Sequence, residues 1–215
     1  MRDKRRWLLL FAVCGNLLCW VGDLLLCVGP NVTVQTLLAD PAGIGAFVLQ
    51  APLWRFTLSA ICGSAAMIAV LCGFYALFCV LRRDNKITAW LVLAGGLFGC
   101  IPGAVFHVLC TTAMWFYARL GGGAAVLQAV LDYFTAHSPI TAMCVVGLVT
   151  ACAALFLAVV RGKTCFPRWA AVFNILLLLV AGSALGIPGS MNLGGVWMFG
   201  GLFCCLQFGS HAKTK

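Results

Sequence analysis

Six long stretches of the 215-residue sequence are almost entirely apolar, and each has the length of a membrane-spanning helix. A spanning helix needs about 20 apolar residues to cross about 30 Å of hydrocarbon. A backbone in contact with lipid must satisfy its own hydrogen bonds, which favours helices. The sequence therefore predicts an all-α, polytopic bundle of six transmembrane helices. We expect one integral membrane domain over residues 1–215, with spans at about 7–29, 54–81, 87–117, 139–160, 169–187 and 192–210.

The composition is typical of a chain surrounded by lipid rather than water. Hydrophobic residues make up 63% of the sequence and charged residues 9%, against about 25% charged residues in soluble domains. The thirteen cysteines form no C-x-x-C pair, and nearly all fall in or beside apolar stretches. We interpret them as small hydrophobic packing residues rather than as a disulfide framework or zinc ligands.

The basic residues favour one orientation in the membrane. If both termini are cytoplasmic, twelve of the fourteen Lys and Arg residues fall on the cytoplasmic side, and only Arg55 and Arg119 lie outside. This asymmetry follows the positive-inside rule. The net charge of +9 then predicts contacts with anionic lipid headgroups at the short basic loops, and no nucleic-acid partner.

Two outer loops are long enough to have structure of their own. Residues 30–53 contain several prolines and glycines, which predicts a turn-rich lid rather than a helix. Residues 124–136 place apolar side chains on one face, with Gln128, Asp132 and Thr135 on the other. This second pattern predicts a short amphipathic helix that lies in the outer membrane interface.

Four polar residues, each from a different predicted helix, fall at a similar level near the outer side. At 1.5 Å per residue, Asp23 lies near the outer end of the first span and His107 near the outer side of the third. Arg55 begins the second span, and Asn192 begins the sixth. Ionisable groups inside a membrane are costly and usually face the bundle interior. The sequence therefore predicts a ligand-binding site formed by Asp23, Arg55, His107 and Asn192.

Asp132 and His137 are secondary candidates that would lie over this site. Purely structural roles remain open: Asp23 and Arg55 as an ion pair that joins two helices, and His107 as a hydrogen-bonding residue between helices. The two histidines and two aspartates have acceptable metal-ligand chemistry but no diagnostic spacing. We therefore expect no metal site and no cofactor.

Short motifs along nearly the whole chain resemble a family of uncharacterised bacterial membrane proteins with six helices. The matching residues are Gly22-Asp23, Arg55, Phe106-His107, Phe166-Pro167-Arg168-Trp169, Pro188 and Asn192. The resemblance implies the bacterial plasma (inner) membrane and brings no activity with it. A looser similarity to membrane hydrolases of the alkaline-ceramidase type does not include their late H-x-x-x-H pair.

The favoured function is that of an integral membrane protein of unknown biochemical role that binds a lipid or amphipathic ligand in an outer-leaflet pocket. This interpretation leans away from an enzyme and leaves the oligomeric state open. The alternative is a lipid-modifying hydrolase with Asp23 or His107 as general base. A small transporter is less favoured, because no inverted repeat is visible and the inner leaflet has few polar residues.

Overall fold

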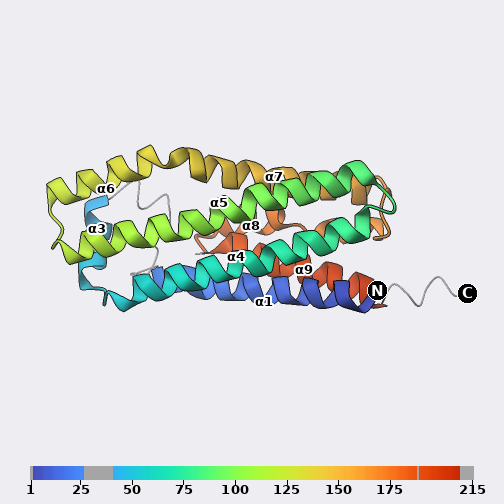
Figure 1. Ribbon diagram of the computed structural model, residues 1–215, viewed down its shortest axis with the longest axis horizontal. Coiled ribbons are helices and arrows are strands. Elements are labelled where there is room, and N and C mark those ends of the chain that lie inside the picture. The colour runs from blue at the N-terminus through green and yellow to red at the C-terminus, as the bar shows by residue number, and fades with distance from the viewer. Residues whose placement is uncertain (1, 27–40, 188, 209–215) are drawn as a thin grey trace, which may run out of the picture.

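The computed structural model describes residues 2–26, 41–187 and 189–208, and within these ranges the chain folds into helices without a strand. The helices form an elongated bundle (Figure 1). In chain order they are α1 (Arg2–Leu26), α3 (Pro41–Gln50), α4 (Trp54–Leu81), α5 (Lys86–Arg119), α6 (Ala124–Ala136), α7 (Ser138–Val160), the 3₁₀ helix η1 (Arg168–Val172), α8 (Ile175–Ala184) and α9 (Ser190–Phe208).

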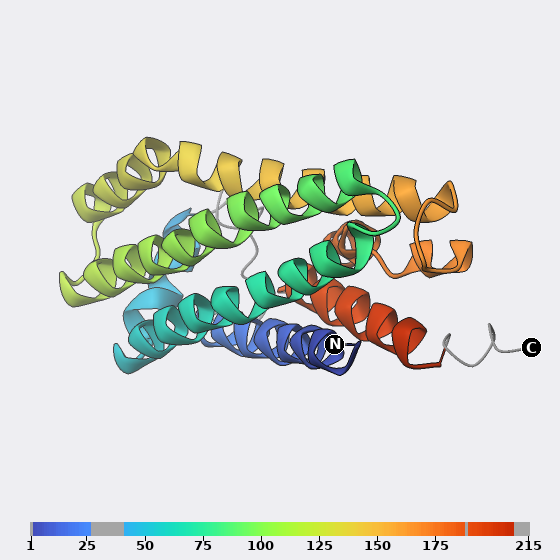
Figure 2. The ribbon, with the colours of Figure 1, turned by 45° about the vertical axis from the view of Figure 1, so that its right-hand side comes forward.

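The long helices pack as a continuous series of neighbours. The order is α9, α1, α4, α5 and α7, and α8 packs against α9. The short helices α3 and α6 lie together at one end of the bundle (Figures 1 and 2). In the middle, Phe74 of α4 meets Phe199 of α9 edge to face, with ring centroids 5.3 Å apart. The main core therefore lies along α4, which contacts both sides of the bundle.

Small residues let the helix backbones approach closely, as expected for membrane bundles. A Cβ atom at Gly95 would lie 2.6 Å from the carbonyl oxygen of Gly147, so α5 and α7 are in direct backbone contact there. A Cβ atom at Gly15 would lie 2.7 Å from the Cβ atom of Ala69, across the contact between α1 and α4. These glycines therefore set how closely α5 approaches α7 and α1 approaches α4.

Among the described residues, five helices are long and apolar enough to cross a membrane: Arg5–Leu26 within α1, and α4, α5, α7 and α9. Their outward faces carry large apolar side chains, such as Ile61, Ile68 and Val146, which are 60%, 68% and 65% exposed. Apolar surfaces of this extent mark contact with lipid or another apolar partner. The fold is thus that of an all-helical membrane protein.

The predicted fifth span, residues 169–187, is not one continuous helix, so the count of six spanning helices is not confirmed. The 3₁₀ helix η1 ends at Val172, and α8 begins at Ile175 and has only 10 residues. Between them, Asn174 is extended and its side chain accepts a hydrogen bond from the backbone N–H of Leu176 at 3.0 Å. An Asn side chain that bonds the nearby backbone competes with the helix. Hydropathy alone does not register this competition.

The break in the fifth segment is stabilised by side chains from neighbouring helices. The Asn174 amide donates to the backbone carbonyl of Cys152 on α7 at 2.9 Å. The indole N–H of Trp197 on α9 donates to the carbonyl of Val172 at 2.8 Å. Irregular backbone at membrane depth is tolerated where protein groups satisfy it. The break is therefore a stable feature of the fold, held by hydrogen bonds from α7 and α9.

Two further predictions concern the loops. The prediction of a lid without a helix over residues 30–53 is wrong for its second half, because α3 occupies Pro41–Gln50; residues 30–40 lie outside the described part. A proline is well suited to the first turn of a helix, which explains why Pro41 begins α3 rather than preventing it. The helix predicted at 124–136 is confirmed as α6.

The start of α1 and the end of α9 lie at the same end of the molecule (Figure 1). Arg6 donates to the side chain of Gln207 at 2.7 Å and to the carbonyl of Leu206 at 3.1 Å. Arg5 donates to the carbonyl of Cys79 near the end of α4 at 3.3 Å. Cations thus pair with helix C-terminal carbonyls at this end, where they complement the helix dipoles.

Candidate functional site

Three helices bring together a compact polar cluster near the α3 and α6 end of the main bundle. Its members are Cys19 and Asp23 of α1, His107 of α5 and Asn192 of α9. We call these four residues the outer cluster. Three of the four predicted site residues therefore converge, although they are far apart in the sequence.

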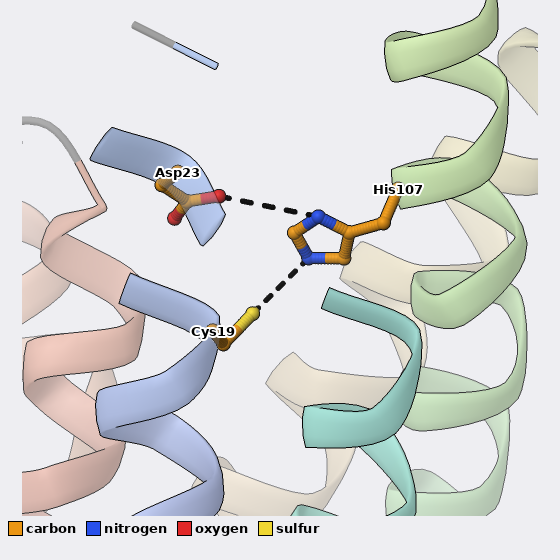
Figure 3. A group of neighbouring side chains, drawn as sticks. All are labelled: Cys19, Asp23 and His107. Carbon is orange, nitrogen blue, oxygen red and sulfur yellow. Dashed lines mark hydrogen bonds and ion pairs between the residues drawn. The ribbon is translucent and has the colours of Figure 1, made fainter. Parts of the chain in front are cut away.

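The imidazole of His107 lies between two side chains of α1 (Figure 3). Its Nε2 atom is 3.1 Å from the sulfur of Cys19, and its Nδ1 atom is 4.0 Å from Oδ1 of Asp23. Cys19 and Asp23 share a helix face because residues four apart lie one above the other. The ring can therefore interact with both at once, one through each nitrogen.

A glycine on α4 makes room for the histidine. A Cβ atom at Gly63 would lie 2.5 Å from Nδ1 of His107 and 2.9 Å from its Cβ atom. Any larger residue at this position would have to displace the ring. Gly63 thus helps to set the position of His107 against α1.

The carboxylate of Asp23 is held from the side opposite the histidine. Its Oδ2 atom accepts a hydrogen bond of 2.6 Å from the amide of Asn192. The turn before α9 passes close by at Gly189, which has a φ of +66°. A Cβ atom there would lie 2.8 Å from Oδ2 and 2.6 Å from Cδ1 of Trp20. Gly189 therefore suits both the turn and the close approach to Asp23.

The side chains of the outer cluster differ in their exposure. Cys19 is fully buried, whereas the side chains of His107 and Asp23 are 12% and 21% exposed. Counted along the helices, Asp23 lies about 27 Å from Arg5, and His107 about 32 Å from Lys86. These lengths are close to the hydrocarbon thickness of about 30 Å. Asp23 and His107 therefore lie about one hydrocarbon thickness along their helices from Arg5 and Lys86.

Arg55 lies next to the outer cluster rather than in an ion pair with its carboxylate. Its guanidinium donates to the carbonyl of Leu24, one residue beyond Asp23, at 3.3 Å. His107 lies at that carboxylate, with its Nδ1 atom 4.0 Å from Oδ1 of Asp23. The alternative left open by the sequence, an Asp23–Arg55 ion pair between the first two helices, is not among the ion pairs of the described residues. The hydroxyl of Ser59 makes a second backbone contact, to the carbonyl of Gly22 at 2.7 Å.

The two secondary candidates are held within their own helix. Asp132 accepts a hydrogen bond of 2.8 Å from Gln128 on the exposed face of α6. Nδ1 of His137 is 2.7 Å from the carbonyl oxygen of Tyr133, and the two rings are tilted by 41° with centroids 4.3 Å apart. Within the described part of the chain, these contacts of Asp132 and His137 do not reach the outer cluster.

Sequence reasoning missed two residues of this site. Cys19 was grouped with the other cysteines as a packing residue, and Gly63 was not singled out. For Cys19 a signal was present, because it precedes Asp23 by four residues and so lies on the same helix face. For Gly63 the sequence carries no such signal, since its role depends on how α5 packs against α4.

The outer cluster combines a thiol, an imidazole and a carboxylate. One ligand atom from each of Cys19, Asp23 and His107 can be chosen so that all lie within 4.8 Å of one another. Together they can accept and donate hydrogen bonds, move a proton through the imidazole, or ligate a metal ion. This versatility distinguishes the cluster from a simple packing contact.

Comparison with known proteins identifies a family for the chain but no activity. No curated protein and no solved structure matches it. The resemblance to an uncharacterised family is confirmed: the model of the family of unknown function DUF6796 matches residues 1–207, and the chain belongs to this family.

Proposed function

We propose that this membrane protein binds the polar headgroup of a lipid or other amphipathic ligand at the outer cluster. The observation that carries the proposal is the convergence of Asp23, His107 and Asn192 from three helices at a partly exposed position. Polar groups at this depth are costly unless they have partners. A ligand at the exposed parts of the Asp23 and His107 side chains would supply the remaining hydrogen bonds.

In this proposal the ligand has two kinds of contact. Hydroxyl or amine groups of a headgroup would donate to the carboxylate of Asp23, and the imidazole of His107 would orient them. An anionic group would meet Arg55, whose guanidinium already lies at the carbonyl of Leu24 beside the cluster. Acyl chains would follow the apolar outer faces of the helices.

The proposed topology has six crossings with both termini in the cytoplasm of a bacterial cell, in its inner membrane. The break at Phe173 and Asn174 does not prevent a crossing, because η1, the link and α8 together advance about 30 Å. Support comes from the start of α1 and the end of α9 at one end of the bundle (Figure 1), which requires an even number of crossings. Basic residues gather at that end, as the positive-inside rule favours for the cytoplasm.

Anionic headgroups are the proposed partners of this basic end. A groove of about 340 Å³ lies between α5 and α7, with Arg161 and Lys163 among its lining residues. Its remaining lining includes the apolar side chains of Ile87, Leu91 and Leu157. An acyl chain in the groove with its phosphate at the two cations would match both kinds of lining.

A lipid-modifying hydrolase remains the second candidate, and one observation favours it. His107 is placed with one ring nitrogen facing the Cys19 thiol and the other facing the Asp23 carboxylate (Figure 3). A base oriented by a third group is typical of nucleophilic catalysis. Against this function, Cys19 is fully buried and so does not face a substrate.

Native mass spectrometry of the detergent-purified protein tests the proposal, with phosphatidylglycerol and phosphatidylethanolamine as probes. We expect Asp23→Asn to lose retained or added lipid, because the charge is removed while the amide oxygen can still accept from Asn192. Asp132→Asn is the matched control, since the same change is made on the exposed face of α6. Equal lipid binding by the wild type and Asp23→Asn would refute a headgroup site. Turnover of either lipid would favour the hydrolase instead.

A further inference from the structure

We propose that Cys19, Asp23 and His107 form a binding site for a divalent transition metal ion, with Zn²⁺ as the best match. The inference deepens the proposed function, and rests on it, because it concerns the same outer cluster. It departs from the expectation of no metal, which considered only histidines and aspartates. The structure adds a cysteine to that set.

The spacing of the ligand atoms favours this assignment. A tetrahedral zinc ion has bonds of about 2.0–2.3 Å to N, O and S, so its ligand atoms lie about 3.3–3.8 Å apart. One ring nitrogen of His107, the sulfur of Cys19 and a carboxylate oxygen of Asp23 can be chosen so that all three lie within 4.8 Å of one another. The sulfur is 3.1 Å from Nε2, and Oδ1 is 4.0 Å from Nδ1. All three separations therefore lie within about 1 Å of the tetrahedral range.

The charges of the three groups also match a divalent cation. A thiolate, a carboxylate and a neutral imidazole carry two negative charges in total, which one M²⁺ ion neutralises. Isolated charges at membrane depth are costly. The side chains that contact the Asp23 carboxylate are the amide of Asn192 and the imidazole of His107. A bound ion would therefore remove a charge imbalance that these neutral partners leave.

The chemistry of the donors selects the kind of ion. Thiolate and imidazole ligands suit zinc, whereas magnesium and calcium prefer oxygen ligands. Asn192 donates to Asp23 at 2.6 Å and is placed as the outer hydrogen-bond partner that ligating carboxylates usually have. Three protein ligands leave the fourth position for water or a ligand headgroup, as in catalytic zinc sites.

Burial alone does not account for Cys19. Cys152 of α7 is equally buried, at 0% exposure, and it belongs to no group of potential metal ligands among the described residues. Among the described cysteines, Cys19 is the one grouped with a histidine of α5 and with an aspartate one turn along α1. The comparison of these two cysteines separates a ligand from a packing residue, and it gives a matched control.

The test is metal binding by the full-length protein in detergent. Chelator-stripped wild type is incubated with Zn²⁺, desalted and analysed for bound metal, and a parallel sample receives Co²⁺ for absorption spectroscopy. We expect one ion per chain and a thiolate-to-cobalt charge-transfer band. Cys19→Ser should lose the band and lower zinc affinity by at least tenfold, and Asn192→Ala by about 10- to 100-fold. Cys152→Ser should behave as the wild type.

Size-exclusion profiles and circular dichroism of the stripped proteins show whether each variant is folded. If Cys19→Ser does not fold, the cobalt spectra of the wild type and of Cys152→Ser decide. Absence of the thiolate-to-cobalt band from the wild type overturns the inference. Equal zinc binding by Cys19→Ser also overturns it. Lipid that is retained without metal, and unaffected by Cys19→Ser, leaves the proposed headgroup site intact while the metal site fails. If Asp23→Asn lost both zinc and lipid while Cys19→Ser kept both, the metal site would be rejected, because Cys19 would not be needed for zinc binding.

Discussion

Two polar sites interrupt the apolar bundle, and their hydrogen-bonding partners differ in completeness. At the break in the fifth segment, Asn174 is 2% exposed and uses its amide and its carbonyl group within the protein. In the outer cluster, Asp23 is 21% exposed and has one amide donor and a more distant imidazole. α9 contacts both sites, through Trp197 and Asn192.

This difference separates a structural polar site from a functional one. A buried polar group that is hydrogen-bonded within the protein stabilises one backbone path, and its burial keeps it out of reach of a ligand. A partly exposed carboxylate has unused acceptor positions. The comparison therefore predicts that substitutions at the break will affect stability, and that substitutions in the outer cluster will mainly affect binding.

The largest expected effect is at Gly63, where one substitution should affect both stability and binding. Gly63→Ala puts a methyl group where the His107 ring lies, and overpacking of this kind costs about 1–3 kcal/mol. Displacement of the ring should also weaken zinc binding by at least tenfold. Gly99→Ala is the matched control, because its nearest neighbouring heavy atom would be 3.4 Å away. Thermal unfolding and zinc titration of both variants check this. Identical behaviour of the two would mean that Gly63 does not position His107.

An intermediate effect is expected at the break. Asn174→Ala removes the hydrogen bonds to Cys152 and Leu176, and we expect a loss of about 1 kcal/mol in stability. Lipid and zinc binding should not change, because the outer cluster is untouched. Thermal unfolding in detergent measures the first effect, and native mass spectrometry the second. A change in binding without a change in stability would reverse the assignment of the two sites.

The smallest effect is expected at Asp132, on the exposed face of α6. Asp132→Asn weakens a single hydrogen bond to Gln128 four residues away, and such pairs contribute about 0.2–0.5 kcal/mol. Neither zinc nor lipid binding should change. Loss of either ligand in this variant would return Asp132 to the site and would require α6 to close over the outer cluster.

Much of the helical structure was predictable because apolar length is a local property. The span predicted at 54–81 is α4 to the residue, and the amphipathic helix at 124–136 is α6. The fifth span was not predictable, because the competition at Asn174 is settled by a carbonyl of α7 and an indole of α9. Those partners are far away in sequence, so a hydropathy pattern contains no trace of them.

The sequence predicted how far along each helix the candidate site residues lie, but not which side chains contact one another. Asp23, His107 and Asn192 were expected at one depth, and the structure brings them together. Arg55 was predicted at the same site, with an ion pair to Asp23 left open as a structural alternative, and its guanidinium donates to the backbone carbonyl of Leu24. Counting residues gives a position along each helix, whereas pairing depends on how each helix is rotated about its axis.

The sequence by itself determined the all-helical class with membrane-spanning lengths, the approximate bounds of the longest helices and the position of the polar residues along them. A helix rises by a fixed distance per residue, so these features follow from counting. The tertiary structure alone decided that Cys19 joins Asp23 and His107, and that Gly63 makes the room for them. The physical reason is that helix rotation and approach are set by close packing between helices, where a single missing side chain decides which neighbours can meet.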